Sequence, residues 1–375
     1  MTDQFIPSRY CLLDVIENGY PILIFYITTA TIVLIIFRHF RKKKRFIILL
    51  SLYTSIAGAV LCAVVPDYRT LVISRCIRGI SVGLNFSSVG ILYANLISSY
   101  DLYNLGKFIG LVATSIGGGW VAIMGYLLLD TLGWRVLVVC TSVPVFIPPI
   151  LILHCLVTHE EYSALSSNDD EHLKATSMSG VQLKVVDNYT ARVVKSCAAN
   201  FICSLQGLGS ILLIPALLSY ENQLNGNIVT PKNKLLILAL IYGVARVIGR
   251  LSGFFFMKYI KFRILHPINS TIIALSYTLI VVEYDNLQIV IIALFLSSMA
   301  YCITQIEVTL MEVDEYYFGS DGLVFGAGIT IAFGSVGASV GAVLAAFLDA
   351  KIALIFTMAA SYVQIIVFCC ITERN

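Results

Sequence analysis

Charged residues are scarce in this chain of 375 residues. Asp, Glu, Lys and Arg make up 13% of the sequence and hydrophobic side chains 58%, and the mean hydropathy is +0.87. Soluble domains carry about twice that share of charge, so the composition excludes an ordinary soluble domain. The net charge of +3 comes from basic residues scattered along the chain, which indicates no nucleic-acid partner.

Motifs of enzymes and of cofactor sites are also missing from the sequence. No Gly-x-x-x-x-Gly-Lys-Ser/Thr phosphate loop occurs, so nothing indicates ATP-driven transport. The five histidines lack the spacing of metal ligands, and there is no Gly-x-Ser-x-Gly nucleophile elbow. Of the ten cysteines, nine lie within or at the ends of apolar segments, which favours buried thiols over a disulfide framework. We therefore expect no enzyme, no cofactor and no metal.

What the chain does contain is eleven long apolar segments. A helix needs about 17–25 apolar residues to cross a bilayer core of about 30 Å, and each segment meets that length. Strands are excluded because no alternating pattern of about ten residues occurs. The sequence predicts an all-α, polytopic membrane protein that lies in a lipid bilayer, with eleven transmembrane helices near residues 20–37, 46–65, 71–96, 107–128, 134–157, 196–218, 234–257, 264–282, 288–311, 322–348 and 351–371.

Landmarks of the first half recur about 216 residues later. The basic loop at 38–45 returns at 258–263, and Gly106 returns as Gly322. Internal repeats of hydrophobic segments are typical of secondary transporters, whose two halves move around a central site. The glycine-rich spans that begin at Gly106 and Gly322 are candidates for the moving helices, although static packing also favours glycine.

The repeat predicts two pseudo-repeated helical bundles. We expect five spans in 1–157 and six in 196–375, joined by a polar linker at 158–195. Placing the linker in the cytoplasm puts fifteen of the 25 Lys and Arg residues on that side, as the positive-inside rule requires. The span at 196–218 has no mate in the first half, so the repeat predicts twelve helices, of which the first is missing.

Several runs of residues resemble a known family. They are Arg41-Lys42-Lys43-Lys44 after the first span, Arg75-Cys76-Ile77-Arg78-Gly79-Ile80-Ser81-Val82-Gly83, Leu92-Tyr93-Ala94-Asn95 and Leu132-Gly133-Trp134-Arg135. The chain resembles the major facilitator superfamily, and within it the branch of synaptic-vesicle-related and organic-ion transporters. It departs from that pattern in lacking the Asp and the Gly of the first cytoplasmic loop, and in having Asn95 where the branch has Glu. The resemblance implies a major facilitator fold and alternating access.

Charges inside the spans are the clearest indication of a site. Arg246 lies near the middle of its span, and Arg250 follows one turn later on the same face. A charge at the bilayer centre costs about 2.5–3.5 kcal/mol on insertion scales, so it needs a partner or a hydrated cavity. Two interpretations of Arg246 stay open, namely contact with an anionic solute and a structural role. For Arg250 we favour an ion pair with Glu307.

Further residues are candidates for the same site or for gates. Uncharged polar side chains that could bind the solute beside Arg246 are Tyr242, Asn85, Gln206, Tyr301 and Gln305, although interhelical hydrogen bonds would explain them equally well. The expected gating residues are Arg41, Lys42, Lys43, Arg75, Arg250 and Glu307.

The function that these patterns favour is secondary active transport of a small organic, anionic solute, with a proton or another ion as the candidate coupling species. An alternative from a different class is a transport-incompetent membrane protein that acts as a partner or scaffold. The missing first helix and the altered loop motifs favour the alternative. A wrong start site would also explain the missing helix.

Overall fold

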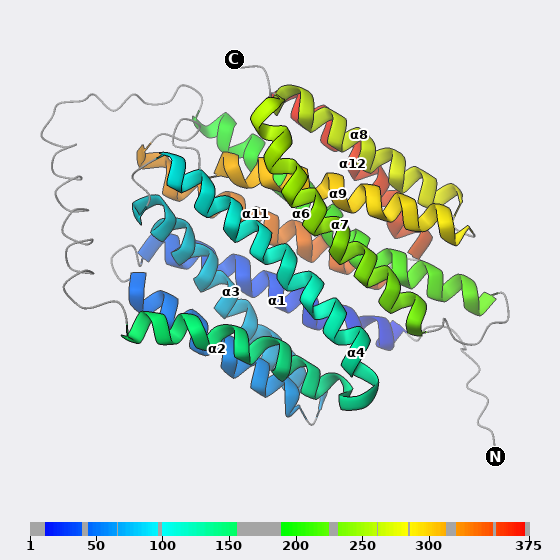
Figure 1. Ribbon diagram of the computed structural model, residues 1–375, viewed down its shortest axis with the longest axis horizontal. Helices are drawn as coiled ribbons and strands as arrows, with labels where there is room; N and C mark the ends of the chain where they lie inside the picture. Colours follow the sequence, from blue (N-terminus) through cyan, green and yellow to red (C-terminus); the bar gives the residue numbers. More distant parts are fainter. Residues whose placement is uncertain are drawn as a thin grey trace, which may run out of the picture.

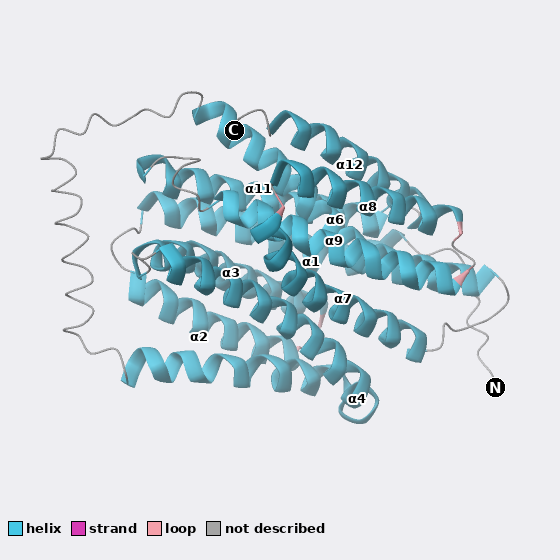
Figure 2. Ribbon diagram, turned by 45° about the horizontal axis from the view of Figure 1, so that its top comes forward, coloured by secondary structure: helices cyan, strands magenta, loops and turns pink. Residues whose placement is uncertain are grey.

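The computed structural model describes residues 12–39, 44–65, 67–96, 100–155, 189–224, 232–260, 262–283, 286–312, 320–347 and 350–371. All regular secondary structure in these ranges is helical, as predicted (Figure 2). The helices are α1 (Leu12–His39), α2 (Lys44–Ala63), α3 (Tyr68–Leu96), α4 (Tyr100–Cys155), α6 (Tyr189–Leu224), α7 (Lys232–Tyr259), α8 (Phe262–Val282), α9 (Leu287–Glu312), α11 (Ser320–Phe347) and α12 (Ala350–Ile371) (Figure 1).

Each predicted span coincides with one of these helices or extends at most two residues past its end, and two of the spans share α4. The two arms of α4 join at Gly133, which has φ 70° and ψ 165°. This left-handed conformation favours glycine and lets the chain reverse between the arms. Arg135 holds the second arm near the end of α2, since its Nη2 donates to the backbone oxygen of Val65 over 2.9 Å. The helix α6 starts at Tyr189, so the last seven residues of the predicted linker, 189–195, are helical.

Long apolar stretches recur along the described helices. Four stretches there are long and apolar enough to cross a membrane, and three further apolar stretches are shorter. The four are Phe46–Ala63, Thr131–Leu151, Ile264–Val282 and Gln288–Ile306, and the shorter ones are Tyr20–Ile36, Gly328–Leu344 and Ile352–Val367. They occur in both halves of the chain, as the repeat requires.

The helices form two bundles whose internal packing is repeated. In the first bundle α3 packs against α1 and α2, and α2 packs against α4. In the second bundle α9 packs against α7 and α8, and α8 packs against α12. The bundles meet where α1 contacts α11 and where α4 contacts α7 (Figure 1). This arrangement is that of two pseudo-repeated helical bundles.

Close helix contacts occur at equivalent places in both bundles. A Cβ on Gly79 of α3 would lie 2.5 Å from the backbone oxygen of Phe25 in α1. A Cβ on Gly249 of α7 would lie 2.5 Å from the backbone oxygen of Met299 in α9. Only glycine allows backbones to approach this closely, and close packing is what holds helices together in lipid.

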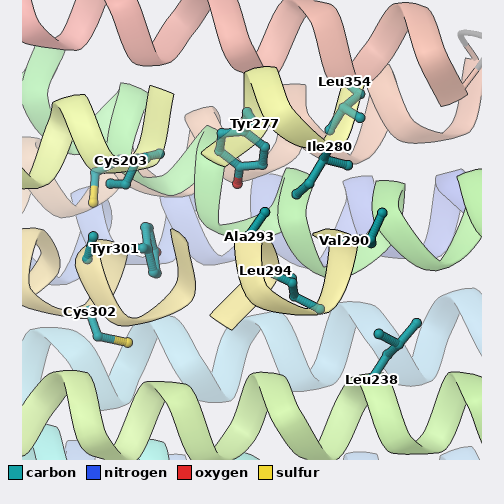
Figure 3. Packing of buried hydrophobic residues seen from close by; sticks show 12 residues of the cluster. Cys203, Leu238, Tyr277, Ile280, Val290, Ala293, Leu294, Tyr301, Cys302 and Leu354 are labelled. Atoms are coloured by element: carbon teal, nitrogen blue, oxygen red, sulfur yellow. The ribbon is translucent and has the colours of Figure 1, made fainter. Parts of the chain in front are cut away.

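The best-enclosed core lies in the second bundle. Side chains from α6, α7, α8, α9 and α12 meet there, among them Cys203, Leu238, Tyr277, Tyr301 and Leu354 (Figure 3). The Tyr277 hydroxyl donates to the backbone oxygen of Gln206 over 3.2 Å, which ties α8 to α6. Interhelical hydrogen bonds of this kind stabilise membrane bundles in addition to packing.

Candidate functional site

Three of the predicted site residues lie on one face of α7. Tyr242, Arg246 and Arg250 are spaced four residues apart, so their side chains stack along the helix. Arg246 is near the middle of α7 and retains partial exposure, whereas Arg250 is only 1% exposed. The two arginines therefore have different environments although they are one turn apart.

Aromatic rings surround the Arg246 guanidinium. Its Cζ lies 5.3 Å from the centre of the Tyr242 ring and 5.8 Å from the centre of the Tyr301 ring. Rings within about 6 Å stabilise a cation through their π faces, more so where water is excluded. The Arg246 Nε has no hydrogen-bond partner in the described part of the chain. The rings thus hold the cation in place while leaving hydrogen-bond capacity unused.

Arg250 has a polar partner, though not the expected one. Its Nη2 donates to Gln305 Oε1 over 2.6 Å. Glu307 lies in α9, but its side chain is outside what the structure describes, so the predicted ion pair stays a prediction. Among the described residues, Arg250 Nε and Nη1 have no hydrogen-bond partner. The thiol of Cys302 interacts electrostatically with both Arg246 and Arg250.

A tyrosine from the first bundle joins this cluster. Tyr26 of α1 interacts electrostatically with Tyr242, Arg246 and Arg75. The helices α1 and α7 are not among the pairs that pack closely in the described structure, so Tyr26 acts on Tyr242 and Arg246 through space, across the boundary between the bundles. The cluster therefore combines residues from both halves of the protein.

Tyr26 and Arg246 occupy equivalent positions of the repeat. The helices α1 and α7 both have 28 residues, and their first residues, Leu12 and Lys232, are 220 apart, as are Tyr26 and Arg246. The offset of about 216 residues between the glycine landmarks would instead pair Arg246 with Ala30. Aligning the two halves by the ends of their helices, and not by the glycines and loops, would have indicated Tyr26 as the equivalent of Arg246.

The other predicted residues have varied locations. Gln206 is fully buried, and its Nε2 donates to Ser361 Oγ over 3.0 Å, so it connects α6 to α12 rather than lying beside Arg246. Asn85 is exposed on α3. Arg75 is partly exposed on α3, near Tyr26. The expected gate residues Arg41, Lys42 and Lys43 lie outside the described residues.

The arrangement of bundles matches a solved transporter structure. The chain superposes on the xylose transporter XylE of Escherichia coli, in a partially occluded inward-open conformation, with a TM-score of 0.70. The match covers 99% of this chain and 92% of that one, at 12% sequence identity. The chain thus has the major facilitator fold, which is that of an integral, multi-pass membrane protein.

Sequence comparison gives a second, shorter match. The inner membrane transport protein YdhP of Escherichia coli, from strains K12 and O157:H7, is 28% identical over 142 residues. The matched region is 37% of this chain and 34% of YdhP, so the similarity spans about one third of those curated relatives. No protein-family model matches the chain. The comparisons therefore show the major facilitator fold and identify no branch of the proteins that share it.

Proposed function

We propose that the protein transports a small organic anion by alternating access, with Arg246 as the contact for the negative charge. The observation that carries this proposal is the placement of Arg246 in the middle of α7, within 6 Å of the centres of the Tyr242 and Tyr301 rings. A midplane cation is costly unless it is compensated, and a bound anion supplies that compensation. Arginine suits the role because its fork binds a carboxylate at two points and stays charged.

The moving parts in this proposal are the two bundles, 1–157 and 196–375, which rock about their shared boundary. The contacts α1–α11 and α4–α7 form that boundary. Because Tyr26 and Arg246 belong to different bundles, the contacts of a solute between them would change whenever the bundles move relative to each other. A gradient of protons or of another ion supplies the driving force.

Uptake by purified protein in liposomes tests the proposal. We expect uptake of radiolabelled benzoate and none of tetraethylammonium. Arg246→Ala should lower anion uptake about tenfold or more, since the loss of a charged hydrogen bond costs about 1.5–3 kcal/mol. Arg246→Lys should restore part of it, because a lysine makes a single-point contact. A matched control is Arg69→Ala, at the exposed start of α3. Anion uptake that is indifferent to Arg246 would contradict the site.

A second candidate function is that of a membrane partner or scaffold that moves no solute. It is favoured by the open surface of α4, where a Cβ on Gly117 would meet no atom within 4 Å. We propose that a helix equivalent to α6 completes the first bundle, encoded upstream or contributed by another protein. A stretch of about twenty apolar codons before Met1 would support the upstream source. Absence of uptake even with that helix restored would favour the scaffold.

A further inference from the structure

The two rings beside Arg246 come from different helices. Tyr242 lies on α7 itself, one turn before Arg246, so its ring is carried by the same helix as the guanidinium. Tyr301 lies on α9, and the centre of its ring is 5.8 Å from Arg246 Cζ. The Tyr301 side chain is buried, with 8% of its surface exposed. The contact between this ring and the guanidinium therefore depends on what packs around Tyr301.

The far end of the Tyr301 side chain lies against Gly207 of α6. A Cβ on Gly207 would overlap Tyr301 Oη and Cζ and would lie 3.0 Å from Tyr301 Cε2. Cys203, one turn before Gly207 in α6, belongs to the same buried cluster as Tyr301 (Figure 3). The phenol thus occupies the space that a side chain at position 207 would need, and glycine at this position leaves room for it.

Two other helices fix the backbone of α6 at this level. The backbone oxygen of Gln206, the residue before Gly207, accepts from the Tyr277 hydroxyl of α8 over 3.2 Å. The Gln206 Nε2 donates to Ser361 Oγ of α12 over 3.0 Å. Since close-packed interiors transmit strain, a larger residue at position 207 would displace the Tyr301 ring, because the backbone of α6 is held by these bonds.

We propose that Gly207 is a positioning residue of the anion site, because it makes room for the phenol whose ring holds the Arg246 guanidinium. This inference rests on the proposed function and adds α6 to the helices that form its site. A cation held against an aromatic ring is ordered before the anion arrives, so less conformational freedom is lost on binding. Displacement of the Tyr301 ring leaves the charge in place and lets the guanidinium move, which weakens anion binding.

The concentration dependence of radiolabelled benzoate uptake by purified protein in liposomes tests the proposal. Gly207→Ala should raise the KM for benzoate about fivefold, which is in the range expected for a lost cation–π contact. Tyr301→Leu removes the ring and should raise the KM by a similar factor. Tyr301→Phe keeps the ring, so its KM should stay within about twofold of the wild-type value.

The double variant Gly207→Ala/Tyr301→Leu distinguishes positioning from a general loss of packing. Its KM should equal that of Tyr301→Leu alone, because the added methyl group then has no ring to displace. Independent effects would instead multiply to about 25-fold, and that result would overturn the proposal. If Gly207→Ala does not fold, the double variant should restore a monodisperse protein in size-exclusion chromatography, and failure to do so would also overturn the proposal.

The matched control is Gly58→Ala in the first bundle. Gly58 is buried on α2, and a Cβ there would lie 2.6 Å from Arg78 Cγ of α3, so this change also places a methyl group against a side chain of a neighbouring helix. It should leave the KM for benzoate unchanged. Uptake that depends on Arg246 but has the same KM in Gly207→Ala as in the wild type would overturn this inference and leave anion transport standing. Absence of benzoate uptake by the wild type would refute the proposed function and this inference with it.

Discussion

The helices α11 and α12 and the two arms of α4 are repeat partners, yet their surroundings differ. On α11, a Cβ on Gly334 or Gly337 would overlap Asn200 or Phe201 of α6. On α4, a Cβ on Gly117 would meet nothing within 4 Å. On α12, five residues that pack toward α6 and α8 are buried, namely Ala353, Leu354, Thr357, Ser361 and Gln364, whereas none of Thr131–Leu151 in α4 is buried.

The difference shows what α6 does for the second bundle. It covers α11 and α12 together and allows polar contacts such as that of Asn200 Nδ2 with the Thr330 backbone oxygen, 2.8 Å away. Within the described residues, no helix packs against the two arms of α4 as α6 packs against α11 and α12. Glycines on a helix allow a neighbouring helix to pack closely, but they stabilise the fold only where such a neighbour is present. The glycine-rich sequences of α4 and α11 therefore have unequal effects on stability.

The largest expected effect on stability comes from replacing a glycine by leucine on α11 and, for comparison, on α4. Gly337→Leu should severely destabilise the protein, by about 3 kcal/mol or more, because the new side chain meets the Phe201 backbone. Gly117→Leu, the matched change on α4, should leave stability nearly unchanged. Thermal unfolding in detergent, followed by size-exclusion chromatography, measures both. Equal damage by the two changes would show that a helix covers α4 as well.

A smaller contrast is expected in chemical access. Ile116 on α4 is 54% exposed and Ala338 on α11 is 6% exposed. In detergent, a maleimide should therefore modify Ile116→Cys several-fold faster than Ala338→Cys, because the reactive thiolate forms only where water reaches the sulfur. Mass spectrometry of the labelled peptides separates these thiols from the native ones. Equally slow labelling of both variants in detergent would show that another helix covers Ile116 on α4.

The contribution of side-chain hydrogen bonds to stability should also differ between α12 and α4, by a smaller amount. Ser361→Ala removes the partner of Gln206 Nε2 in a fully buried place and should cost about 1 kcal/mol. Thr141→Ala on α4 removes only a bond to the same helix, from Oγ1 to the Leu137 oxygen at 2.8 Å, and should cost little. Unfolding midpoints of the two variants give the comparison. Similar losses in both variants would mean that the α6–α12 contact adds no stability.

The smallest expected effect distinguishes α3 from its repeat partner α9. Asp67 caps α3, accepting from the Thr70 hydroxyl at 2.6 Å and the Thr70 backbone NH at 2.9 Å. Those two hydrogen bonds hold the pKa of the Asp67 carboxyl below its usual value, and the bond from the Thr70 hydroxyl has the larger effect. The cap of α9 is Asn286, which accepts from the backbone NH of Gln288 and does not titrate.

Because the folded-state pKa of Asp67 is the lower one, its cap contributes stability at neutral pH. This contribution should fade as the pH falls below about 4, through the folded-state pKa. Asp67→Asn should show a slightly flatter dependence of melting temperature on pH, and Asn286→Ala should lower the melting temperature equally at all pH values. Parallel pH profiles for the wild type and Asp67→Asn would contradict the capping role.

Much of the fold was predictable because bilayer physics constrains it. A long apolar segment must form a helix in lipid, where each backbone polar group needs an internal partner. That reasoning predicted every described helix, and it placed Arg246 at the middle of one. It did not predict that Arg250 would donate to Gln305, since charge alone indicated Glu307, and the ion pair with Glu307 stays a prediction.

What the sequence alone determined is the membrane environment, the helical class, the internal repeat and the existence of a central cation. Each of these depends on hydrophobicity and spacing along the chain, which are local properties. Only the tertiary structure placed the Tyr301 ring beside Arg246 and Gln305 beside Arg250. Those contacts depend on the rotation and depth of α7 against α9, which pack closely at residues such as Gly249.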